Sequence, residues 1–203
     1  MGEELRKFLL MTFITAVVST TALFAQSADE IAAAGKFDGQ MYTNKSLGLT
    51  ILAPGGWTFF PYTRNEALVA KNRATNKDLE AINTQVLFQA TPSKLLGSET
   101  SAIFSAGIQT QIKGKTAAQY AATSRDLLTA QGATLSRDIS ETKLGNVTFS
   151  TFEITGKVND KEYRQIYLVT LRKGVAVFFV ETFYDNKNTF AVDASLRTVK
   201  FAK

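Results

Sequence analysis

Residues 147–184 read VTFSTFEITGKVNDKEYRQIYLVTLRKGVAVFFVETFY and show the most regular apolar pattern of the chain. Apolar side chains alternate along Val147–Ile154, Tyr163–Arg172 and Val175–Tyr184, which predicts three strands. Short Asn-Asp and Lys-Gly sequences separate the strands, and both suit tight turns. Consecutive strands joined by such turns pair antiparallel, so this stretch predicts a three-stranded meander.

The third of these strands is apolar on both of its alternating faces. A strand that is buried on both faces needs a covering layer above and below the sheet. In the first strand the apolar parity shifts between Phe149 and Phe152, which predicts a β-bulge.

Two helices are expected to supply the covering layers. The first is predicted over Thr116–Gln131, where Thr116 caps the start, Gln119 completes a capping box, and Gly132 ends the helix. The second is predicted near Thr189–Leu196. Further strands are expected at Leu47–Ala53, Thr84–Ala90 and Ala102–Gln111. The sequence therefore predicts an α+β fold, an α/β/α sandwich whose largely antiparallel central sheet has helices on both faces.

The N-terminal 25 residues have the pattern of a secretory signal peptide. Arg6 and Lys7 precede the uncharged run 8–25, and small or polar residues follow it. Cleavage is expected near Ala25 to Ser27, which predicts a periplasmic or secreted protein. An uncleaved run would instead tether the chain to a membrane. Residues 26–40 are weakly patterned and are expected to be a flexible leader, and 41–203 a single domain.

The composition restricts the chemistry. The 203 residues contain no Cys and no His, which excludes disulfides, thiolate and imidazole catalysis, and a lipoprotein anchor, and argues against zinc sites. We therefore expect no catalytic residues, no metal and no cofactor. The net charge of +5 is mild, and an exported protein is not expected to bind nucleic acid.

Three short segments resemble the start of the PsbP-like domain: Tyr42-Thr-Asn44, Gly48-Leu-Thr-Ile51 and Pro54-Gly-Gly-Trp57. The later order of helix, strands and C-terminal helix with Ser195 also resembles that family, over about Gly39 to Phe201. The resemblance implies an α/β/α sandwich used mostly for binding. Its members include the extrinsic photosystem II protein, periplasmic proteins of non-photosynthetic bacteria and secretion-system chaperones. Family members that bind metals often use His, so no metal role is implied for this chain.

The family-motif residues Pro54, Gly56, Trp57 and Ser195 are expected to be structural. No ligand-binding residue follows from the sequence. Trp57 heads an aromatic group with Phe59, Phe60 and Tyr62, which is interpreted as a core anchor, with a ligand pocket as the alternative.

Charged residues of the meander leave two further alternatives. Glu153, Glu162 and Glu181 lie on neighbouring strands and could form a carboxylate pair for hydrolysis. Asp185 and Asp193 could join Glu181 at Ca²⁺, but their spacing does not fit a calcium loop. Five cations near the strand ends are interpreted as solvated edge charges, with an acidic partner as the alternative: Lys157, Lys161, Arg164, Arg172 and Lys173.

The expectation is thus a monomeric, non-enzymatic binding or assembly module of the bacterial cell envelope. Its partner would be a protein or lipid, with no photosystem involved. The alternatives are a carboxylate-dependent hydrolase and a membrane-tethered envelope protein.

Overall fold

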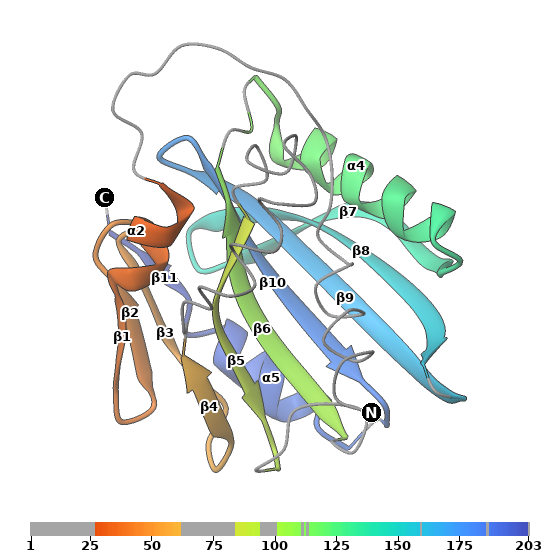
Figure 1. Ribbon diagram of the computed structural model, residues 1–203, viewed down its shortest axis with the longest axis horizontal. Helices are drawn as coiled ribbons and strands as arrows, with labels where there is room; N and C mark the ends of the chain where they lie inside the picture. Colours follow the sequence, from red (N-terminus) through yellow and green to blue (C-terminus); the bar gives the residue numbers. More distant parts are fainter. Residues whose placement is uncertain are drawn as a thin grey trace, which may run out of the picture.

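The computed structural model describes residues 27–61, 84–93, 101–110, 112, 114–158, 160–185 and 187–202 (Figure 1). The expected signal peptide at 1–25 lies outside these residues, as does Tyr62. Within the described ranges, no helix combines the length and apolar character that crossing a membrane requires.

A seven-stranded sheet forms the centre of the fold, and every neighbouring pair in it is antiparallel. Its spatial order is β4-β5-β6-β10-β9-β8-β7. The bounds are β4 Thr58–Pro61, β5 Thr84–Thr91, β6 Ala102–Gln109, β7 Thr134–Leu144, β8 Val147–Val158, β9 Lys161–Arg172 and β10 Val175–Phe183. The three strands of the expected meander are β8, β9 and β10, so this part of the prediction is confirmed.

The predicted bulge in the first strand of the meander is wrong. β8 pairs with β9 without a register shift from Ser150 to Val158. Phe149 and Phe152 instead lie on opposite faces of the sheet, each in a different buried cluster. The apolar parity changes because β8 is covered on both faces. The shifts in pairing with β7 arise where β7 has extra residues, between Leu135 and Ser140.

Helix α4 (Ala117–Ala130) covers one face of the sheet and contacts β7, β8 and β9. Its capping box is confirmed, because Thr116 accepts a hydrogen bond from the Gln119 N–H and the Gln119 side chain accepts one from the Thr116 N–H. Gly132 follows the helix with φ +97°, a left-handed conformation that glycine adopts without strain.

A smaller sheet and two short helices cover the opposite face. The small sheet has the order β1-β2-β3-β11, with bounds Gly35–Asp38, Met41–Asn44, Leu49–Leu52 and Lys200–Phe201. The helices are α2 (Ala28–Ala33) and α5 (Thr189–Leu196). Figure 1 shows this mixed layer and α4 on opposite sides of the large sheet. The α+β class fits, but the structure does not confirm the α/β/α sandwich with helices on both faces, because a four-stranded sheet makes up much of the layer opposite α4.

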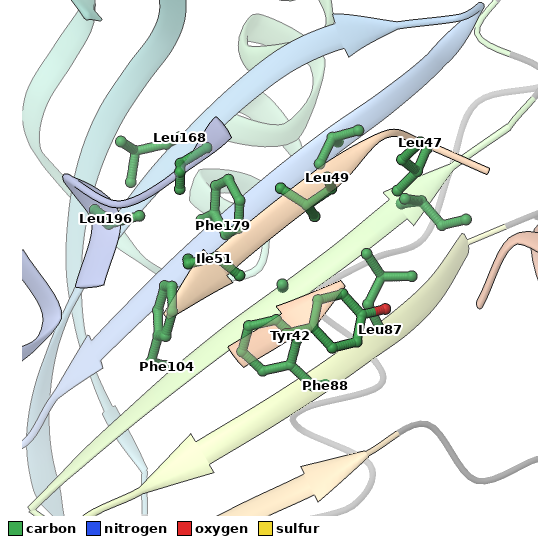
Figure 2. Close-up of a cluster of buried hydrophobic side chains, with 14 of the residues drawn as sticks. Tyr42, Leu47, Leu49, Ile51, Leu87, Phe88, Phe104, Leu168, Phe179 and Leu196 are labelled. Carbon is green, nitrogen blue, oxygen red and sulfur yellow. The ribbon is translucent and has the colours of Figure 1, made fainter. Parts of the chain in front are cut away.

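Aromatic side chains fill the space between the two sheets (Figure 2). Tyr42 of β2 packs on Phe88 of β5 with ring centroids 4.8 Å apart, and Phe88 meets Phe104 of β6 at 5.8 Å. Phe104 stacks on Phe179 of β10 at 5.9 Å, and Ile51 of β3 lies beside them. The small sheet therefore forms one wall of the main core.

Residues expected to be a flexible leader form part of this core. Ser27 and Glu30 form a capping box at the start of α2, which buries Ala28, Ile31 and Ala32. β1 then pairs with β2 along its whole length. The pattern looked weak in the sequence because small alanines provide much of the buried face, and β1 is only four residues long.

Candidate functional site

The Pro54–Trp57 motif forms a tight turn that directs Trp57 into the core. The Trp57 N–H donates to the Pro54 carbonyl at 3.2 Å, and Gly56 has φ +77°. Trp57 is 8 % exposed, and Phe59 stacks on Phe37 at 5.0 Å within the same cluster. The structure thus places Trp57 and Phe59 against the core.

Ser195, the fourth residue of the family motif, lies at the end of α5 beside this turn. Its hydroxyl donates to the carbonyl of Leu52, two residues before Pro54. The structure therefore brings the four motif residues together at the end of β3. There the hydrogen bond from Ser195 links this end of the strand to α5.

Two of the three glutamates considered for hydrolysis share one row of the large sheet. Glu153 of β8 and Glu181 of β10 both pair with Ile166 of β9, so they lie on the same face with one strand between them. Both are buried. Glu162 lies near the β8–β9 turn instead and forms an ion pair with Lys157 at 3.3 Å.

Burial changes the ionisation of Glu181. Removal from water raises the pKa of its carboxyl to about 8, and the negative charges of Asp193 and Glu153 act in the same direction. The positive charge of Arg164 acts in the opposite direction and is not enough to restore the ordinary value. Glu181 is therefore largely protonated at pH 7.

Arg164 lies on β9 two residues before Ile166, the residue with which both glutamates pair. It pairs with Thr155 of β8 and Phe183 of β10, diagonally between Glu153 and Glu181. Its guanidinium carbon lies 5.2 Å from the centre of the Phe183 ring. Its Nε is buried and has no hydrogen-bond partner among the described residues.

An open groove of about 700 Å³ lies at the end of β8, the start of β9 and the end of β10, near the C-terminal end of α4. Arg164 and Phe183 contribute to it from one face of the sheet. Tyr163 and Tyr184 of the same two strands also line it, but their rings pack in the cluster on the α4 face. The remaining lining residues are Gly132, Thr134, Thr155, Gly156, Lys157, Glu162 and Asp185. Burial raises the pKa of both tyrosines, so their hydroxyls stay protonated. The groove thus places one guanidinium beside the Phe183 ring, while the two tyrosine rings pack on the other face of the sheet.

The five cations named from the sequence do not gather at one site. Lys157 is paired with Glu162, and the Lys161 Nζ lies 4.8 Å from the centre of the Tyr184 ring. Arg172 stacks on Phe201, and Lys173 donates to the Ser46 carbonyl, both at the other end of β9 from Arg164.

The acidic residues form no metal site within the described residues, where no group of three suitable side chains occurs. One oxygen of Asp185 accepts a hydrogen bond from the Lys187 N–H at 2.9 Å. Asp193 lies on α5, near enough to influence Glu181 by its charge.

Comparison with solved structures shows which known fold this chain resembles. Its α+β fold, built on antiparallel sheets, is similar to the solution structure of cyanobacterial PsbP (CyanoP) from Synechocystis sp. PCC 6803. That match has a TM-score of 0.50 and 15 % identity, and it covers 80 % of this chain and 92 % of that chain. The chain therefore has a PsbP-like fold. At this identity the likeness concerns the fold alone.

A crystal structure from Bacteroides thetaiotaomicron VPI-5482 also matches, with a TM-score of 0.47 and 12 % identity. It covers 82 % of this chain, which spans 50 % of that protein's length. No protein-family model and no curated protein matches the sequence.

Proposed function

We propose that this chain is an exported, non-enzymatic binding or assembly module of PsbP-like fold. It acts as a monomer on a protein or lipid of the bacterial cell envelope. The observation that carries the proposal is the groove beside Arg164, which offers a phenyl ring, that of Phe183, and an unused guanidinium. The signal-like N-terminal segment supports export, and the absence of Cys and His fits a binding role.

The arrangement of the carboxylates favours binding over hydrolysis. An acid and a base for glycoside cleavage must both reach the scissile bond from a common cleft. Glu153 and Glu181 share a row of the sheet, but neither lines the groove. Two acidic residues do line the groove, and both already have partners. Glu162 forms an ion pair with Lys157, and the Asp185 side chain accepts a hydrogen bond from the backbone N–H of Lys187.

Photo-cross-linking in intact cells tests the proposal. A benzophenone amino acid replaces Lys157 at the rim of the groove, and Lys143, an exposed lysine at the far end of the edge strand β7, serves as the matched control. We expect one discrete cross-linked species from position 157 and none from position 143. Equal cross-linking from both positions would contradict a partner at the groove.

Mass spectrometry of the purified protein tests export separately. A mature N-terminus between Gln26 and Ala28 is expected. An intact segment 1–25 in the membrane fraction would favour the tethered alternative, and turnover of a glycoside lost in E181Q would favour the hydrolase.

A further inference from the structure

We propose that Arg164 and the groove around it bind the carboxylate of an organic ligand that carries an aromatic or apolar group next to that carboxylate. This inference rests on the proposed binding function and names the ligand class of the same groove.

The guanidinium of Arg164 has binding capacity that the described part of the protein does not use. No hydrogen bond or ion pair joins it to another described side chain, and its Nε is buried without a partner there. The guanidinium carbon lies 5.2 Å from the centre of the Phe183 ring, and this cation–π contact helps to hold the guanidinium in position. A buried donor without an acceptor is costly. A planar, pre-oriented guanidinium fits a carboxylate through two parallel hydrogen bonds.

The surrounding charges favour a single negative charge on the ligand. Lys157 is neutralised by Glu162, and Lys161 lies against the Tyr184 ring. Arg164 is therefore the lining cation that is left for an anion. The neighbouring carboxyl of Glu181 is largely protonated at pH 7 because burial raises its pKa to about 8, so Glu181 does not neutralise Arg164. A phosphate dianion would need a second cation.

The walls of the groove favour an aromatic or apolar body on the ligand. The Phe183 ring lies beside the guanidinium and offers an apolar surface, and Gly132 adds no side chain that would fill the groove. The Tyr163 ring lies over Gly156, where a methyl group would come within 2.5 Å of the tyrosine oxygen. These contacts hold the Tyr163 ring on the α4 face of the sheet, opposite the face that carries Arg164 and Phe183.

Calorimetric titration of the full chain with matched probes tests the inference. The first pair is N-acetyl-phenylalanine and its amide, and the second is a four-residue peptide ending in phenylalanine with a free or an amidated C-terminus. Binding of both acids indicates that the carboxylate and aromatic group suffice. Binding of the peptide acid alone identifies a chain terminus as the source of the carboxylate. Either result, with each amide at least about tenfold weaker, supports the inference.

Variants of two stacked arginines on β9 provide the control. R164Q is expected to weaken binding of the acid about 10- to 100-fold, the effect of losing hydrogen bonds to a charged group. R164K keeps the charge without the planar fork, and we expect an intermediate loss. R172Q removes a guanidinium that stacks on Phe201 at 4.8 Å outside the groove, and it should leave binding unchanged. Urea unfolding of each variant confirms that it is folded.

Equal binding of acid and amide would overturn the inference, as would unchanged binding by folded R164Q. Tighter binding of inorganic phosphate than of the acid would overturn the choice of a carboxylate. If neither acid binds at millimolar concentration, the carboxylate inference fails. A specific cross-link from position 157 would then still support the binding function, so the two failures are distinguishable.

Discussion

The hydroxyl of Ser195 donates a hydrogen bond to the carbonyl of Leu52, and the Leu52 N–H donates to the hydroxyl of Thr198 at 2.8 Å. The backbone pairing of β3 with β11 extends only to Thr50 and Lys200. The two hydroxyls therefore continue the pairing beyond the strand and fix the C-terminal helix on the small sheet.

Replacing Ser195 with alanine should destabilise the protein by about 0.5–1.5 kcal/mol, because the buried Ser195 side chain no longer donates its hydrogen bond to the Leu52 carbonyl. Urea unfolding measures the change. S140A is the matched control, since Ser140 is an exposed residue on β7. Equal midpoints for S195A and S140A would show that this hydrogen bond does not stabilise the fold.

Asn44 fastens α2 to the small sheet, and its loss should be costly. Its side-chain amide donates to the Ile31 carbonyl at 2.7 Å, and its oxygen accepts from the Leu47 N–H at 3.1 Å. N44A removes both contacts from a buried site, so we expect a loss of about 2–3 kcal/mol. Unfolding of N44A and of a chain starting at Gly39 should both show reduced stability. An unchanged midpoint for the shortened chain would mean that 27–38 is a dispensable leader.

Gly107 of β6 pairs with Phe178 of β10, and the phenyl ring lies over the glycine. A β-carbon at position 107 would lie 2.2 Å from two ring atoms and 3.0 Å from the Gln85 carbonyl. G107A should therefore destabilise by about 1–3 kcal/mol, the usual cost of overpacking. In a double-mutant cycle with F178L, the two effects should be less than additive, because the smaller side chain relieves part of the clash. Strict additivity would exclude this contact as the cause.

Glu181 should make stability depend on pH. The unfolded carboxyl releases its proton near the ordinary value of 4.5, whereas the folded one keeps it to about pH 8. The folded state thus holds the extra proton in this range, and the free energy of unfolding should fall by up to about 1.4 kcal/mol per pH unit as pH rises from 4.5 to 8.

Urea unfolding of the wild type and E181Q at several pH values between 4.5 and 9 isolates this contribution. The difference between the two should change across the window and level off above it. E162Q alters an exposed glutamate and should follow the wild type. A constant difference between wild type and E181Q would contradict a raised pKa.

The sequence was informative where pattern and chemistry are local. The meander follows from alternating apolar residues, and the capping box of α4 follows from Thr116 and Gln119 at the required spacing. β7 was missed because it is an edge strand with mostly exposed polar residues, such as Arg137 and Glu141. Its strand state depends on pairing with β8, which no local pattern contains.

The groove could not be predicted for the same reason. Arg164 was recognised only as one of several edge charges, since the partner that distinguishes it is Phe183, 19 positions away and set opposite by the β9–β10 register. Glu153 and Glu181 were correctly placed on neighbouring parts of one sheet. Their burial beneath the second layer, and thus the raised pKa of Glu181, depends on residues from the chain termini.

Amide NMR spectra of the ¹⁵N-labelled full chain during titration with N-acetyl-phenylalanine test the central claim most directly. We predict that the largest shifts cluster at Gly156, Tyr163, Arg164 and Phe183, while the family-motif residues around Trp57 stay unchanged. The amide of the same compound should produce no such cluster. Shifts centred on Trp57, or equal shifts with acid and amide, would contradict a carboxylate-binding groove at Arg164.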